Sequence, residues 1–196
     1  EACIPKRRCL DLYKSFLRDT INTASKVKCE EKFLAYESPY RIPHFLSAIA
    51  PSFRLFRQKG RGLGRRMHNA FLYRSEDKAS KMVMVGSDAP DLPVEYLEGA
   101  FRKLDNHDLV LGPTRDGGYY LIGLKHSDPA LFRGIKWSSG KVLEDTLKNA
   151  ERLKKKTALL GIWYDVDYPE ALDLLERRLK ENKNKGIARW TRRFLG

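Results

Sequence analysis

The chain has 196 residues, 42% of them hydrophobic, so it is long and apolar enough to bury a core, and its composition excludes a disordered protein. No apolar run approaches the roughly 20 residues of a membrane-spanning helix, and the first residues lack the basic start and apolar core of a secretory signal. Lys and Arg number 38 against 25 acidic residues, and the net charge of +13 predicts an anionic partner such as a nucleotide or a nucleic acid.

Hydrophobic periodicity predicts helices and strands that alternate along the chain. In chain order we expect a helix over 10–25, strands at 32–36 and 53–56, a helix over 63–71, a strand at 82–85, a helix over 93–104, strands at 108–113 and 119–124, a helix over 139–150, a strand at 159–164 and a helix over 169–179. This alternation favours a three-layer α/β/α fold with a mostly parallel sheet covered on both faces. We expect a single domain over residues 1–196 that ends in a basic tail, residues 181–196.

The basic tail is typical of a solvated helix end and terminus. Its cations also stand beside Trp190 and Phe194, and a basic stripe with aromatic residues could instead stack on nucleic-acid bases. The three cysteines, Cys3, Cys9 and Cys29, match no zinc spacing, and we interpret them as reduced thiols of a cytoplasmic protein.

A carboxylate follows the most apolar of the expected strands. The run Met82-Val83-Met84-Val85 is typical of a buried parallel strand, and Gly86-Ser87-Asp88 comes directly after it. Ligands of open α/β sheets bind beyond the carboxyl ends of the strands, so Asp88 is a candidate ligand of a metal or a phosphate-bearing substrate. The alternative is an ordinary turn in which Ser87 or Asp88 starts the next helix.

A second pair of carboxylates, Asp165 and Asp167, follows the last expected strand. In an extended segment residues two apart share a face, so with Asp88 they could form an oxygen cage for Mg²⁺ or Mn²⁺. The alternative is that Asp167 caps the helix that opens at Pro169 and that Asp165 is a surface acid.

Two glycine-bearing loops complete the candidate site. Gly60, Gly62 and Gly64 precede a helix among four cations, a pattern in which backbone N–H groups can approach a phosphate, or which is simply a flexible connection. The segment Asp116-Gly117-Gly118-Tyr119 is either an ordinary hairpin turn or a loop whose glycines permit close approach of a ligand.

Taken together, these motifs resemble the DUF2064 family, also called selenodomain-associated transferase 1. The resemblance covers about residues 10–180 and is carried by segments that occur in the expected order: Gly60-x-Gly62-Leu63-Gly64-x-Arg66-Met67, Gly86-Ser87-Asp88-x-Pro90-Asp91-Leu92, Gly112-Pro113-x-x-Asp116-Gly117-Gly118-Tyr119, Phe132-x-Gly134-Ile135-x-Trp137-Ser138 and Asp165-Val166-Asp167-x-Pro169. The family is a branch of the nucleotide-diphospho-sugar transferase (GT-A) superfamily and is similar to the guanylyltransferases of molybdenum-cofactor and F420 biosynthesis.

The resemblance implies a GT-A fold, a nucleoside triphosphate or nucleotide-sugar donor, and a divalent metal held by Asp88, Asp165 and Asp167. It also implies that Gly60, Gly62, Leu63 and Gly64 shape the nucleotide pocket, that Arg66 offsets phosphate charge, and that Asp116, Gly117, Gly118 and Tyr119 line the acceptor side.

The chain departs from the family pattern in two places. Members normally begin with a strand and a basic Lys-Thr-Arg-Leu loop, and because only Ile4-Pro5-Lys6-Arg7-Arg8 stands before the first expected helix, we expect this first strand to be absent. Tyr168 stands where the family commonly has a small capping residue, so the local start of the helix is expected to differ.

The leading hypothesis is a metal-dependent nucleotidyl- or glycosyltransferase whose acceptor the sequence does not identify. The alternatives are a degenerate relative that binds nucleotides without turnover and a basic nucleic-acid-binding module. The sequence does not separate nucleotidyl from glycosyl transfer, because the carboxylates and glycines would serve either reaction.

Overall fold

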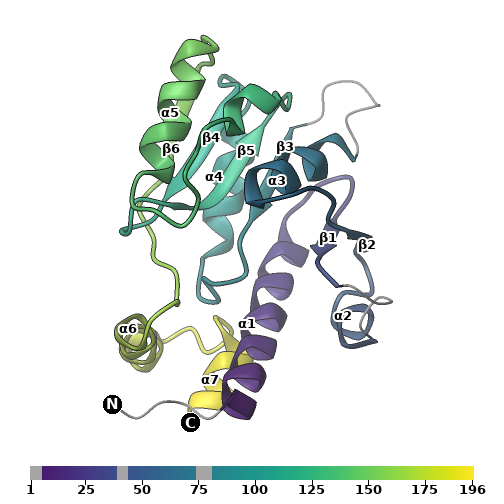
Figure 1. The fold of residues 1–196 in the computed structure, drawn as a ribbon. Coiled ribbons are helices and arrows are strands. Elements are labelled where there is room, and N and C mark those ends of the chain that lie inside the picture. The colour runs from purple at the N-terminus through teal and green to yellow at the C-terminus, as the bar shows by residue number, and fades with distance from the viewer. Residues whose placement is uncertain (1–5, 39–43, 74–80) are drawn as a thin grey trace.

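The computed structural model describes residues 6–38, 44–73 and 81–196 (Figure 1). Its first element is the long helix α1 (Lys6–Lys26). The expected absence of a strand before this helix concerns residues 1–5, which lie outside the described residues. Within the described ranges, no helix combines the length and apolar character that crossing a bilayer requires.

The main sheet has four strands in the order β3-β5-β4-β6, namely β3 (Met82–Val85), β5 (Tyr119–Leu124), β4 (Leu109–Pro113) and β6 (Thr157–Leu159). Strand β6 is parallel to β4, whereas β5 is antiparallel to both β3 and β4. Three strands therefore share one direction and β5 opposes them, because the tight turn between β4 and β5 can only join antiparallel strands.

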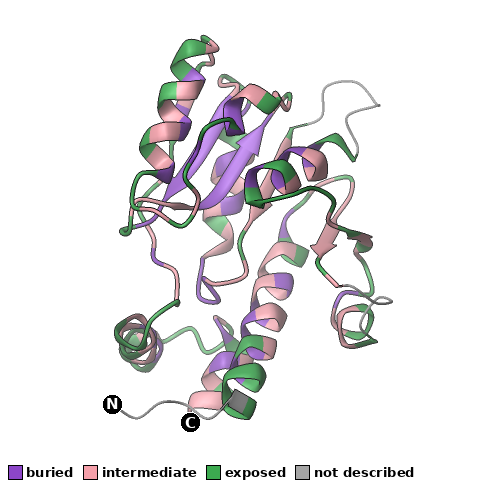
Figure 2. Cartoon of the chain, viewed as in Figure 1, coloured by how far each residue is buried: buried purple, intermediate pink, exposed green. Residues whose placement is uncertain are grey.

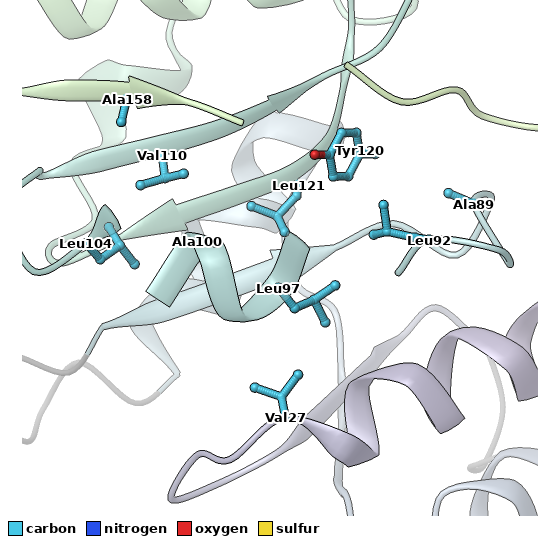
Figure 3. Packing of buried hydrophobic residues seen from close by; sticks show 10 residues of the cluster. All are labelled: Val27, Ala89, Leu92, Leu97, Ala100, Leu104, Val110, Tyr120, Leu121 and Ala158. Atoms are coloured by element: carbon cyan, nitrogen blue, oxygen red, sulfur yellow. The ribbon is translucent and has the colours of Figure 1, made fainter. Parts of the chain in front are cut away.

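Helices cover both faces of this sheet, which confirms the three-layer prediction. On one face, α4 (Val94–Lys103) packs Leu97 and Ala100 against Val110 and Leu121 (Figure 3). The other face is covered by α3 (Leu63–Leu72), the short 3₁₀ helix η1 (Pro129–Phe132) and α5 (Val142–Arg152). Their buried side chains pack on Leu109, Leu111, Ile122 and Leu124. Side chains that alternate along the strands thus supply a separate core to each layer.

A second, two-stranded sheet lies beside the first. Strand β1 (Phe33–Tyr36) pairs in parallel with β2 (Arg54–Arg57), and the connection contains α2 (His44–Ile49), which the sequence did not predict. The ring of Phe56 stacks on Tyr73 at the end of α3, with centroids 4.3 Å apart. This contact joins the small sheet to the helix that carries the glycine loop.

The C-terminal residues form helices that pack on α1. Helix α6 (Pro169–Glu181) is followed by α7 (Arg189–Leu195), which lies beside α1 (Figure 1). The expectation of a tail is therefore wrong for 189–195, which form a helix with buried and half-buried residues along it (Figure 2). Phe194 packs against the cluster that contains Leu12 and Phe16, and both Trp190 and Phe194 are half-buried. The packing of Phe194 against α1 makes its ring less available for stacking on nucleic-acid bases.

Asp19 anchors α7 to α1. Its carboxylate is 1% exposed and accepts the backbone N–H groups of Trp190 at 3.1 Å and Thr191 at 2.8 Å. Burial raises the pKa of Asp19, and the hydrogen bonds from α7 oppose that rise. A carboxylate at this place satisfies N–H groups that have no partner inside α7 and interacts favourably with the helix dipole.

We expect Asp19→Ala to lower the free energy of unfolding by about 2–3 kcal/mol, because two buried N–H donors lose their acceptor. Urea denaturation measures the change. Asp11→Ala is the matched control, since Asp11 lies on the same helix in an exposed ion pair with Lys14 and is expected to change stability by less than about 0.5 kcal/mol. Equal effects of the two substitutions would contradict the anchoring role.

Candidate functional site

The loop after β3 presents Asp88 from a firmly packed base. The N–H of Gly86 extends the ladder to the carbonyl of Tyr120 at 2.9 Å, and Ala89 and Leu92 are buried in the core under the loop (Figure 3). Asp88 itself is half-buried and accepts a hydrogen bond from Ser87 Oγ at 3.2 Å. The apolar residues around it therefore fix the backbone from which its carboxylate projects.

The segment that carries Asp165 and Asp167 crosses from β4 to this loop. The N–H of Trp163 donates to the carbonyl of Pro113 at 3.0 Å, and the N–H of Val166 donates to the carbonyl of Asp88 at 2.8 Å. The strand predicted at 159–164 thus ends early, as β6, and the following residues continue as a bridged extended segment. The predicted neighbourhood of Asp88 with Asp165 and Asp167 is present.

The aspartates interact through their charges. Burial raises the pKa of Asp88, and the charge of Asp167 raises it further. Burial also raises the pKa of Asp165 to about 7, with further contributions from Asp116, Asp167 and Asp88. Carboxylates this strongly coupled favour binding either a proton or a cation.

The structure contradicts both alternative roles, in which Asp167 caps α6 and Asp165 is a surface acid. Tyr168 occupies the N-cap position of α6, and no side chain caps that helix, so Asp167 is not a capping residue. Asp165 is half-buried rather than a surface acid. The departure at Tyr168 predicted from the sequence therefore corresponds to a helix start without a side-chain cap.

The metal itself stays a prediction. Across residues 6–38, 44–73 and 81–196, no three His, Cys, Asp or Glu side chains are placed so that together they could hold a metal ion. The oxygen ligands are of the type that Mg²⁺ and Mn²⁺ prefer, but the side chains would have to turn toward one another to bind one.

The glycine loop leads into α3 in a conformation that needs glycine. Gly60 has φ 124° and Gly62 has φ 78°, in the region that other residues rarely adopt. A β-carbon on Gly64 would lie 2.7 Å from the ring of Trp137, so the helix start packs directly on that side chain. Leu63 is 50% exposed at the first position of α3.

Arg66 stabilises this loop through two contacts. Its guanidinium forms an ion pair with Glu37 and donates from Nε to the carbonyl of Gly60 at 3.3 Å. The sequence assigned Arg66 to phosphate charge, whereas the structure engages it with β1 and its own loop. Its role in phosphate binding stays a prediction.

The turn 114–118 is both a hairpin turn and a tightly packed loop. Asp116 accepts hydrogen bonds from Thr114 Oγ1 and, at 3.1 Å, from the N–H of Gly118. Gly117 has φ 87°, and a β-carbon there would lie 2.0 Å from the carbonyl oxygen of Gly140. The glycine is thus required by the approach of the loop around Gly140, whatever ligand binds nearby.

Tyr119 needs a correction. Its ring packs edge-on against Trp137, with centroids 6.5 Å apart, and its hydroxyl is buried in the core. The side chain belongs to the layer under α5 rather than to the acceptor side, because strand alternation turns it inward. The prediction for the acceptor side is left with Asp116, Gly117 and Gly118.

Sequence reasoning assigned no role to Asp91, which is the best-connected acid of the region. Asp91 is 4% exposed and accepts Trp163 Nε1 at 3.2 Å, Tyr164 OH at 2.7 Å and Arg178 Nε at 3.2 Å. Asp91 thereby fixes Trp163 and Tyr164, the two residues that directly precede Asp165. The only sign of this role in the sequence was a second acid, Asp91, three residues after Asp88. Its hydrogen-bond partners lie more than seventy residues away in the chain.

The raised pKa of Asp165 predicts a stabilising substitution. Between about pH 4, the value of an unfolded Asp, and about pH 7 the folded protein binds more protons than the unfolded chain, so stability falls as the pH rises through this window. In metal-free buffer at pH 8 we expect Asp165→Asn to raise the free energy of unfolding by about 1–3 kcal/mol, after solvent screening of a half-buried group. Below about pH 4 the difference is expected to vanish.

Urea denaturation with a chelator at both pH values measures this effect. The exposed Asp173, replaced by Asn, is the control and is expected to be neutral at both. A destabilised Asp165→Asn at pH 8, or a difference that does not change with pH, would contradict the electrostatic origin.

Comparison with known proteins places the chain in a family. The family model described as "Uncharacterized protein conserved in bacteria (DUF2064)" matches residues 20–139, more than half of the chain. The chain belongs to the DUF2064 family. The matched range of this DUF2064 protein includes the glycine loop, Asp88 and the Asp116 turn, whereas Asp165 and Asp167 lie beyond it.

Relatives of this DUF2064 protein support the α/β fold described above. It is 29% identical over 116 residues to the 2-phospho-L-lactate guanylyltransferase of Methanocaldococcus jannaschii, a match that covers 59% of the chain and 50% of that relative. The chain thus spans about half the length of the curated relative it matches. A crystal structure from Desulfovibrio desulfuricans G20, of a protein assigned to the nucleotide-diphospho-sugar transferases, superposes with a TM-score of 0.88 and 29% identity and covers 96% of this chain and 82% of that one.

A second solved structure, of 4-diphosphocytidyl-2C-methyl-D-erythritol synthase, has a TM-score of 0.58 at 10% identity and covers 82% of this chain and 88% of that one. At this identity the likeness concerns the fold alone. The α/β fold of nucleotide-diphospho-sugar transferases, expected from the sequence, is confirmed.

Proposed function

We propose that this DUF2064 protein is a metal-dependent nucleotidyl- or glycosyltransferase whose donor is a nucleoside triphosphate or a nucleotide sugar. One observation carries the proposal: Asp88, Asp116, Asp165 and Asp167, which follow three different strands, lie close enough at one edge of the sheet that burial and neighbouring negative charges raise the pKa of Asp88 and of Asp165. The names of the guanylyltransferase relative and of the neighbour with a TM-score of 0.88 support transfer chemistry.

Asp88, Asp165 and Asp167 would hold Mg²⁺ or Mn²⁺. Their oxygens fit these hard cations, and a cation would offset the repulsion that raises the pKa of Asp88 and Asp165. When bound, the metal would bridge the donor phosphates and offset charge on the leaving group. The backbone link between Val166 and the carbonyl of Asp88 keeps the two ligand-bearing segments together.

The protein's own groups would position the donor. The glycine loop at the start of α3 would approach the nucleotide with backbone N–H groups, aided by the positive end of the helix dipole. Arg66 would keep the loop in place through the carbonyl of Gly60. Asp116 and its glycines would border the acceptor, because Asp116 is close enough to raise the pKa of Asp165.

The first test is a thermal-shift panel of nucleoside triphosphates and nucleotide sugars, each with and without Mn²⁺. A ligand at about 100 times its Kd adds roughly 2.7 kcal/mol of stability, which such a panel detects. Stabilisation by one nucleotide that requires the metal would support the aspartate site and identify the donor. No response to any nucleotide would contradict the proposal.

Turnover assays separate the remaining candidates. Release of pyrophosphate identifies nucleotidyl transfer, and release of a nucleoside diphosphate identifies glycosyl transfer. Metal-dependent binding without either product, across a panel of acceptors, identifies a nucleotide-binding relative without turnover. Nucleic-acid binding that falls steeply with salt and does not depend on Mg²⁺ would favour the third candidate, although the packing of Phe194 against α1 disfavours it.

A further inference from the structure

A cavity of about 270 Å³ lies beside the segments that carry the proposed metal ligands and contains none of those ligands in its lining. Its wall contains Trp163, two residues before Asp165, and Asp91, three residues after Asp88. The lining residues are Asp91, Pro93, Trp163, Arg178, Leu179 and, at the α6–α7 connection, Glu181, Asn182 and Ile187. A molecule in this cavity would therefore lie next to the segment that carries the aspartates.

Arg178 is held rigidly at the wall of the cavity. Its Nε donates to Asp91 Oδ2 at 3.2 Å, and its guanidinium lies 4.6 Å from the ring centre of Trp163 and 5.3 Å from that of Tyr164. Nevertheless, 43% of the side chain remains exposed. The contact with Asp91 uses Nε alone, which leaves the terminal amino groups of Arg178 available to a ligand.

Such an arginine is preorganised for an anion. One edge of the guanidinium is taken by Asp91 and its face by aromatic rings, so binding a ligand would cost little side-chain entropy. The remaining amino groups match a carboxylate or phosphate, which arginine binds with paired hydrogen bonds.

The surrounding charge also favours an anion. Asp91 also lines the cavity, but its carboxylate is 4% exposed and is shared among three donors. Residues 177–185 carry five cations, Arg177, Arg178, Lys180, Lys183 and Lys185, against the single acid Glu181. Glu181 is the exposed acid of the lining, and its removal provides a test with the opposite sign.

We propose that Arg178 and this cavity form an anion subsite that takes the carboxylate or phosphate group of the acceptor. The word acceptor rests on the proposed transferase function, whereas anion binding at Arg178 does not. The subsite would orient the acceptor by its anionic end while its reacting group extends toward Asp165.

Inorganic phosphate and acetate are the probes, titrated separately into the ¹⁵N-labelled protein without nucleotide or metal. The Nε–H signal of Arg178 and the indole Nε1–H signal of Trp163 report binding. We expect saturable shifts, about tenfold weaker binding in Arg178→Gln, and a change below twofold in Arg177→Gln. Arg177 is the matched control because it is an exposed neighbour that loses the same charge but does not line the cavity.

Glu181→Gln keeps the result interpretable if Arg178→Gln disturbs the contact with Asp91. Removing the acid is expected to tighten phosphate binding about two- to threefold without touching Arg178. Comparison of the two probes decides between a phosphate and a carboxylate as the preferred group.

Three results would overturn the subsite. They are signal shifts that stay linear with probe concentration, equal losses of phosphate affinity in Arg177→Gln and Arg178→Gln, and unchanged phosphate affinity in Glu181→Gln. The two proposals fail separately. Specific phosphate binding without any metal-dependent nucleotide response would leave the subsite intact and remove the transferase. A nucleotide response without phosphate binding at Arg178 would do the reverse.

Discussion

Replacing Asp88 with Asn is expected to lower metal-dependent turnover at least about a hundredfold while the fold stays intact. Asn keeps the shape of the side chain but removes the negative charge that a divalent cation requires. The fold should tolerate the change, since burial and the charge of Asp167 already disfavour the ionised form of Asp88. Product formation in Mg²⁺ or Mn²⁺ measures the effect, alongside the urea midpoint.

Asp105→Asn is the matched control for this substitution. Asp105 is an exposed aspartate in an ion pair with Lys81, away from the loops that carry the candidate ligands. Its turnover is expected to equal that of the original protein. Unchanged turnover in Asp88→Asn would remove Asp88 from the metal site and, with it, the main support for the proposed mechanism.

Replacing Asp91 with Ala is expected to cost about 2–3 kcal/mol of unfolding free energy, because the buried Tyr164 hydroxyl loses its acceptor whereas Arg178 is partly solvated. The substitution leaves the Arg178 guanidinium without its ion pair and the buried Tyr164 hydroxyl without its acceptor. Burial and the neighbouring Asp91 charge raise the pKa of the Tyr164 hydroxyl, which therefore stays a proton donor to Asp91 throughout the working pH range. Urea denaturation measures the loss.

The exposed Asp173, on the same helix as Arg178, serves as the control for Asp91. Asp173→Ala is expected to change the unfolding free energy by less than about 0.5 kcal/mol. Asp91→Asn should be intermediate, because the amide retains one acceptor oxygen. A loss below about 1 kcal/mol in Asp91→Ala would mean that the three hydrogen bonds are not what holds the segment before Asp165.

Local patterns in the sequence were sufficient for most of the elements. The strand at 82–85 was predicted with the bounds that the structure has, because a continuous apolar run bounded by turn residues leaves little choice. Its expected character was wrong, since it is half-buried rather than buried and pairs antiparallel with β5. Helix α2 was missed because its six residues include no buried side chain that would produce a periodic pattern. Helix α7 was missed because its three cations, Arg189, Arg192 and Arg193, resemble those of a solvated tail, while the carboxylate that supports it belongs to Asp19, far away in the chain.

The sequence likewise predicted only part of the candidate site. That Asp88 would meet Asp165 and Asp167 followed from the sequence, since residues after strands of one direction arrive at one edge of a sheet. The sequence did not predict three features: the inward orientation of the Tyr119 side chain, the ion pair of Arg66 with Glu37, and the hydrogen bonds that converge on Asp91. Each depends on a partner distant in the chain.

The sequence by itself determined the alternation of helices and strands, the family and the chemical character of the carboxylate site, because these depend on residue type and on spacing along a few turns or one strand. Only the tertiary structure decided which acids are buried anchors and which are candidate ligands. Asp19 and Asp91 are as acidic as Asp88, but each is surrounded by donors that satisfy it. The pKa of Asp165 is raised by burial and, further, by the carboxylates near it. The difference lies in the atoms that packing brings around each carboxylate, which spacing along the chain does not encode.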